Sequence, residues 1–161
     1  MDARIRPLTL QLGLNASLIR RALELLRTDD WLRRPVAEGS NAAFVAAHLL
    51  EARASLVRIL GGNPLHAWSA TLERARSVED LGARPSPAEV AEAFDLITAR
   101  LEERLSAATA EDLEAPSGHD FPTGDGTVLG AAAFLSLHES YHVGQLALLV
   151  RALGRGSLTG R

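Results

Sequence analysis

Two histidines four residues apart, His138 and His142, stand in the segment from Thr127 to Leu153. The apolar residues of this segment recur at steps of three and four, the spacing of a helix face that turns inward. That line consists of Val128, Ala131, Leu135, His138, His142, Gln145, Leu149 and Ala152. Because side chains four residues apart lie above one another on one face of a helix, both imidazoles can reach one point. This spacing predicts a metal site inside the fold.

A third histidine, His48, belongs to a second helical pattern of apolar residues, with Phe44 and Val45 before it and Ala52 after it. It is therefore predicted to face the interior as well. Three neutral imidazoles suit zinc, nickel, copper or iron better than calcium or magnesium. The alternative is a polar core in which each imidazole has a hydrogen-bond partner, since burying three unpartnered imidazoles would cost several kcal/mol.

The composition indicates one helical domain. The chain has 161 residues, of which 47% are hydrophobic, so it is long enough to bury a core of its own. Aromatic residues make up only 4% and β-branched residues are scarce, while Leu, Ala, Arg and Glu dominate. These residues favour helices over strands, and we expect an all-α protein. We predict a single domain over residues 1–154 and a disordered tail over residues 155–161.

Charge and residue content exclude several classes of function. With 17 basic and 20 acidic residues and no block of like charge, the chain does not indicate nucleic-acid binding. It contains no cysteine, so a bound metal has to use nitrogen and oxygen ligands. The sequence shows neither a signal peptide nor an apolar run long enough to span a membrane. We expect a soluble cytoplasmic protein.

Four helices are predicted from the periodicity and from the residues that begin and end them. The first follows Pro7 and ends near Leu26, and the second follows a cap at Ser40 and stops at Gly61. The third begins with Ser86, Pro87 and Glu89, which can form a capping box. The fourth is capped by Thr127 and ends before Gly154.

The connections between these helices are of unequal length. Trp31, in the first connection, is predicted to close one end of the fold. Residues 61–85 form a long connection with a short helix expected at 70–76, and residues 109–126 form a loop. Four helices with one long crossover between the second and third predict an up-down four-helix bundle with a polar site in its core.

Several motifs carry a family resemblance. The segment AAHLLEAR contains His48, and HESYHVGQL contains His138 and His142. Trp31 with Pro35 precedes the first of these, the turn TAEDL occupies residues 109–113, and Arg151-Ala152-Leu153-Gly154 follows the second. In this arrangement the chain resembles the DinB family of metal-binding four-helix bundles.

This resemblance implies that His48, His138 and His142 form a three-histidine site for a divalent ion, with zinc or nickel first and iron or manganese next. It implies a metal-dependent enzyme acting on a small molecule. One form is a thiol S-transferase that uses bacillithiol or a similar low-molecular-weight thiol, and another is a metal-dependent hydrolase. The alternative is a non-catalytic, stress-associated helical dimer with a structural ion.

Other polar residues near the histidines have two interpretations each. Gln145 could donate or accept a hydrogen bond inside the site or support a helix contact, and Tyr141 could be a core residue or reach the substrate. His119 lies in the loop before the fourth helix and could act as a general base or simply be exposed. Glu51 and Glu139 could orient a ligand imidazole, although exposed helix faces are the more common position for such residues.

Two helices carry more apolar residues than one inward face requires. The first has Leu14, Leu18 and Leu25, and the fourth has Phe134, Leu137, Tyr141 and Leu148. The bundle itself can absorb these faces, or a second chain can cover them. The family resemblance implies a homodimer packed through helices.

Overall fold

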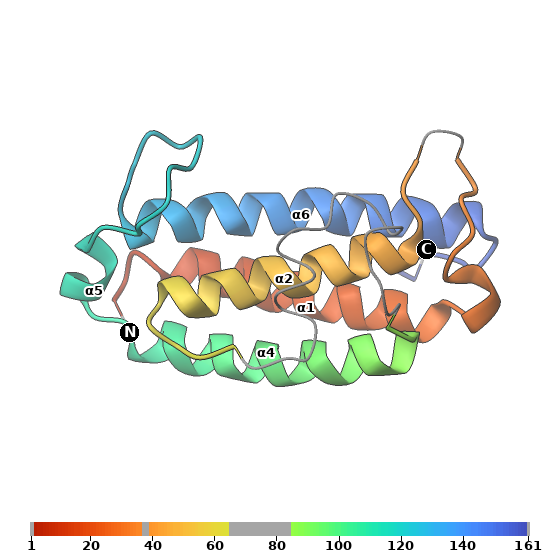
Figure 1. Cartoon of the computed structure of the whole chain (residues 1–161), viewed down its shortest axis with the longest axis horizontal. Helices are drawn as coiled ribbons and strands as arrows, with labels where there is room; N and C mark the ends of the chain where they lie inside the picture. Colours follow the sequence, from red (N-terminus) through yellow and green to blue (C-terminus); the bar gives the residue numbers. More distant parts are fainter. Residues whose placement is uncertain (1, 37–38, 65–84, 161) are drawn as a thin grey trace.

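The computed structural model describes residues 2–36, 39–64 and 85–160, and within these residues the regular structure is helical. Four long helices lie side by side (Figure 1). They are α1 (Arg6–Leu25), α2 (Ala42–Ile59), α4 (Pro87–Ala107) and α6 (Val128–Ala152). A 3-10 turn, η1 (Thr28–Asp30), follows α1, and a short helix, α5 (Ala110–Glu114), follows α4. The predicted all-α bundle is confirmed.

The chain direction explains the length of the second connection. Helices α1 and α6 run in one direction, and α2 and α4 run in the opposite one (Figure 1). The end of α2 and the start of α4 therefore lie at opposite ends of the bundle. The short helix predicted at 70–76, together with His66, lies outside the described residues. Among the described helices, none combines the length and apolar character that crossing a membrane requires.

Side-chain caps begin α2, α4 and α6, mostly where the sequence predicted them. Ser86 Oγ accepts a hydrogen bond from the Glu89 backbone N–H, and the Glu89 carboxylate accepts one from the Ser86 N–H. Thr127 Oγ1 accepts from the Gly130 N–H in the same way. The prediction of Ser40 as the cap of α2 was wrong. Asn41 caps this helix instead, because its Oδ1 accepts from the N–H three residues on at 3.0 Å.

Trp31 closes one end of the bundle, as predicted. Its side chain is 4% exposed, and its indole N–H donates to the Pro85 carbonyl at 2.8 Å. Nearby, Arg155 donates to both carboxylate oxygens of the buried Asp30, at 2.6 and 2.9 Å. Leu158 packs against the core. The segment after residue 154, which we expected to be disordered, therefore begins with residues that have specific partners.

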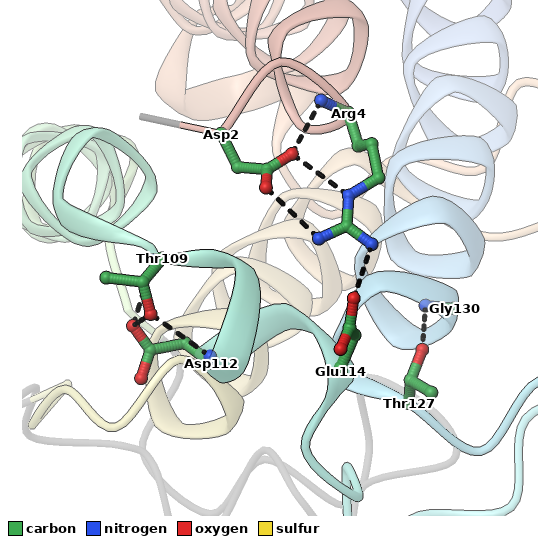
Figure 2. A network of polar contacts seen from close by, with 7 residues as sticks. All are labelled: Asp2, Arg4, Thr109, Asp112, Glu114, Thr127 and Gly130. Atoms are coloured by element: carbon green, nitrogen blue, oxygen red, sulfur yellow. Dashed lines mark hydrogen bonds and ion pairs between the residues drawn. The ribbon is translucent and has the colours of Figure 1, made fainter.

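Polar contacts close the opposite end. Figure 2 shows Arg4 donating to Asp2 and, at 3.0 Å, to Glu114 of α5. The predicted loop over residues 109–126 in fact begins with α5, because Thr109 and Asp112 cap each other's backbone N–H groups. The remainder of this loop returns to the start of α6.

Candidate metal centre

Three histidines from two helices meet at one point. His48 lies on α2, and His138 and His142 lie one turn apart on α6. The Nε2 atom of His138 is 3.1 Å from the Nε2 atom of His48 and 3.1 Å from that of His142. One nitrogen from each ring can be chosen so that all three lie within 4.8 Å of one another. The cluster predicted from the sequence is present.

The depth of the cluster differs from the prediction. The sequence placed His138 and His142 on the fully inward line of the last helix and His48 on an inward face of the second helix, but all three rings are only partly buried. The buried line of α6 is rotated away from them and includes Val128, Ala132, Ser136, Glu139, Val143, Leu146 and Val150. The predicted line also contains buried residues, Val128, Ala131, Leu135 and Leu149, which is why the periodicity did not separate the two faces. The cluster therefore lies at the edge of the interior, within reach of solvent.

A hydrogen bond fixes the orientation of one ring. His142 Nδ1 lies 2.7 Å from Gln145 Oε1. An amide oxygen only accepts, so His142 carries its proton on Nδ1 and turns the lone pair of Nε2 towards the other two histidines. Gln145 Nε2 in turn donates to the Tyr141 hydroxyl at 3.2 Å. Gln145 is thus a hydrogen-bonding residue of the site, and Tyr141, which is 63% exposed, is not a core residue.

The surroundings keep the three imidazoles neutral. Burial lowers the pKa of His48 to about 4, and the nearby rings of His142 and His138 act in the same direction. Burial also lowers the pKa of His138 and of His142. Desolvation disfavours the charged form of an imidazole, so at neutral pH the rings present lone pairs rather than positive charge. A neutral imidazole is the form that binds a metal ion.

The arrangement fits a divalent ion with nitrogen ligands. Two imidazole nitrogens, each about 2.1 Å from one ion, lie about 3.0–3.4 Å apart in octahedral or tetrahedral geometry. The 3.1 Å separations agree with this range. Without an ion, His138 Nε2 has either one proton to donate or one lone pair to accept with, and His142 Nε2 carries no proton, so at most one of the two 3.1 Å contacts is a hydrogen bond. His138 Nδ1 is buried with no hydrogen-bond partner in the described chain, which leaves this ring poorly satisfied by protein groups alone.

Aromatic rings flank the cluster on two sides. Phe44 stacks on His48, and Phe134 stacks on His138, each with 5.9 Å between ring centroids. The loop before α6 adds Phe121, which stacks on Phe134 at 4.9 Å. His119 contacts Phe121 with tilted rings at the exposed end of this row and does not join the other three histidines. The structure therefore does not bring His119 to the site as a base.

Glu51 and Glu139 were considered as carboxylates that could orient a ligand imidazole. Neither lies on an exposed helix face. Glu139 is 1% exposed and accepts two hydrogen bonds from Arg53 instead of contacting a histidine. Glu51 is 7% exposed, forms an ion pair with Arg58, and is close enough to His48 to raise its pKa slightly against the larger effect of burial.

Sequence reasoning missed Arg53. The available signal was the apolar character of α2 on nearly all sides, because a charged residue in such a helix is buried and needs a partner.

Comparison with known proteins agrees with this geometry. A model of the DinB superfamily matches residues 11–146. Searches among curated proteins and among solved structures gave no match. The matched range contains the three histidines and most of each long helix. Because this match covers more than half of the sequence, the chain belongs to the DinB superfamily.

Proposed function

We propose that this protein is a metal-dependent enzyme in which His48, His138 and His142 hold one divalent ion. The observation that carries the proposal is the convergence of the three rings, in which His138 Nε2 lies 3.1 Å from the Nε2 atom of His48 and 3.1 Å from that of His142. Three protein ligands at the edge of the interior leave coordination positions for water or substrate, which is typical of catalytic rather than structural zinc sites. The nitrogen ligands favour zinc or nickel, followed by iron.

A bound ion of this kind lowers the pKa of a coordinated water or thiol, so that a nucleophile forms near neutral pH. The chain has no cysteine, and a thiol nucleophile would have to come from a cofactor. This chemistry supports two related activities on a small molecule: transfer to a low-molecular-weight thiol such as bacillithiol, and hydrolysis. Gln145 holds the His142 ring in the ligand orientation, while Phe44 and Phe134 shield two of the rings from water.

Elemental analysis of protein purified without an affinity tag or chelator tests the site. We expect about one zinc, nickel or iron ion per chain, and none after alanine replaces all three histidines. The single variant His142→Ala should also lose the metal. The matched control is His119→Ala, because this histidine is exposed and outside the cluster. Retention of metal by the triple variant, or absence of uptake by the wild type after ions are added, would contradict the proposal.

Cobalt-substituted protein separates the two activities from a purely structural role. A thiolate that binds the ion adds a charge-transfer band to the cobalt spectrum, so titration with a low-molecular-weight thiol reports access to the metal. We expect this band if the protein is a thiol transferase. Hydrolysis would instead require water at the open position and no thiol band. A cobalt spectrum that no thiol, anion or substrate alters would indicate a sealed structural ion.

We also propose that a second copy of the chain covers the outer face of α1 and α6. Large apolar side chains are exposed there to between 56% and 67%: Leu10, Leu14, Leu137, Tyr141 and Leu148. Gly144 lies between the last two on α6, and a Cβ at this position would meet nothing within 4 Å. A glycine inside an exposed helix costs about 1 kcal/mol relative to alanine, and a closely packed partner helix offsets that cost.

Light scattering at micromolar concentration tests this surface. The wild type should have the mass of a dimer, and Leu14→Lys with Leu148→Glu should yield a folded monomer, because charges on an apolar interface are not compensated. Leu96→Lys, at an exposed leucine of α4 outside this face, is the control and should remain dimeric. A monomeric wild type would exclude the proposed dimer and leave the metal site unaffected.

A further inference from the structure

One guanidinium in the bundle core contacts all of the other long helices. Arg53 of α2 donates to both carboxylate oxygens of Glu139 on α6, at 2.6 and 2.9 Å. It also donates to Thr98 Oγ1 of α4 at 3.0 Å and to the Leu12 carbonyl of α1 at 2.6 Å. The Phe94 ring lies 4.8 Å below its central carbon. Four of the five guanidinium N–H groups therefore have acceptors.

This pair is buried and directional. The side chains of Arg53 and Glu139 are each 2% exposed. A buried ion pair is weak support for stability, because desolvation offsets much of the attraction, and its best-attested role is to specify how elements are aligned. Apolar contacts are non-directional and tolerate small rotations and translations of a helix. A two-point bond between an arginine and a carboxylate tolerates them poorly, since both hydrogen bonds have to be kept.

The same two helices carry the histidines. Glu139 directly follows His138 and precedes His142 by three residues, and Arg53 follows His48 by five residues on α2. The pair therefore joins α2 and α6 close to the histidines. Along the α2 axis it lies about 7.5 Å from the point where the histidines meet, because five residues of an α-helix rise by that amount. A rotation of α6 by about 10° would move an atom about 6 Å from its axis by about 1 Å. Metal-ligand distances have to be held to about 0.2 Å, so such a rotation would disrupt the ligand set.

We propose that Arg53 and Glu139 are positioning residues for the three-histidine site, setting the rotation and level of α6 relative to α2 so that His48 lies opposite the other two rings. This inference rests on the proposed metal-dependent function. It assigns the pair no contact with the ion, the substrate or the imidazole nitrogens. Its role is to hold the ligands in place before the metal arrives, which lowers the cost of binding.

A charge-free replacement of the pair tests this role. The double variant Arg53→Met and Glu139→Leu removes both charges and leaves apolar side chains of similar volume, so the fold should persist. We expect it to bind zinc at least about tenfold more weakly than the wild type by calorimetry, and to show an altered cobalt d–d spectrum. The matched control is Asp30→Leu with Arg155→Met. That pair is also bonded at two points, but it joins the segments that follow α1 and α6, beyond the C-terminal end of α6.

The outcomes separate this inference from the proposed function. Wild-type affinity and an unchanged spectrum in the double variant would overturn the positioning role while leaving the metal site intact. Equal weakening in the control would also overturn it, because the effect would then follow from lost stability. If the wild type binds no metal, the proposed function and this inference both fail. Should the double variant not fold, Arg53→Lys keeps the charge but cannot form the two-point bond, and wild-type metal affinity in that variant would refute the proposal.

Discussion

Acidification below about pH 6.5 should destabilise the metal-free protein. Burial, together with the neighbouring rings, lowers the pKa of His48 in the folded state from 6.5 to about 4. Between these values the unfolded chain binds more protons than the folded chain, so the free energy of unfolding decreases as the pH falls below 6.5. The pKa values of His138 and His142 are lowered too, so these residues act in the same direction.

The size of the effect follows from the His48 pKa. Between about pH 7.5 and about pH 5, a change in pKa from 6.5 to about 4 corresponds to a loss of about 2 kcal/mol. The ring is only partly buried, and solvent screening reduces this to about 1 kcal/mol. A chain of this length would then unfold about 2–4 °C lower.

Urea unfolding of the chelator-treated protein at several pH values measures this loss. His48→Gln removes the titrating group and should flatten the pH dependence. Saturating zinc should raise the stability of the wild type at neutral pH and lose that effect on acidification, as protons displace the ion. A metal-free wild type whose unfolding free energy stays constant or increases towards pH 5 would refute the reasoning.

Three further predictions concern single side chains. Arg53→Met leaves the Glu139 carboxylate buried without its partner and should lower the free energy of unfolding in urea by about 3–5 kcal/mol. Adding Glu139→Leu should restore most of this loss. If the losses of the two single variants simply add in the double variant, the prediction is contradicted. Gly130→Ala places a Cβ against the Asp125 carbonyl oxygen, closer than van der Waals contact allows, and should cost about 1–3 kcal/mol. A variant with wild-type stability would show that the loop can move away freely. Gln145→Leu should weaken zinc binding about 10–100-fold in calorimetry while the metal-free protein keeps its stability; unchanged affinity would exclude an orienting role.

Local rules in the sequence were sufficient to predict most of the fold. The apolar periodicity and the capping residues Ser86 and Thr127 act over a few residues, and the structure follows them. The start of α2 was misplaced by one position because Ser40 and Asn41 are both good capping residues, and packing decides between them. The short helix α5 was overlooked, although Thr109 and Asp112 have the spacing of a capping box.

The site was predictable in its members but not in its depth. Histidines at positions i and i+4 have to share a helix face, whatever the tertiary structure. Which side of that face is buried depends on the partner helix, and the sequence contains that information only indirectly. Glu139 was assigned to a solvated face because its partner Arg53 lies 86 residues away in sequence.

The Arg53 contacts also bear on how the chain folds. Helix α6 is the last of the four in sequence, and among the described residues it supplies the one charged acceptor of this guanidinium. A compact intermediate of α1, α2 and α4 would bury a positive charge without its carboxylate, a state that costs several kcal/mol. Such an intermediate is disfavoured, and we expect folding in a single cooperative transition with no populated three-helix species. Metal-binding competence and the folded core then arise in the same step, so a metal signal in a refolding experiment reports the completed bundle.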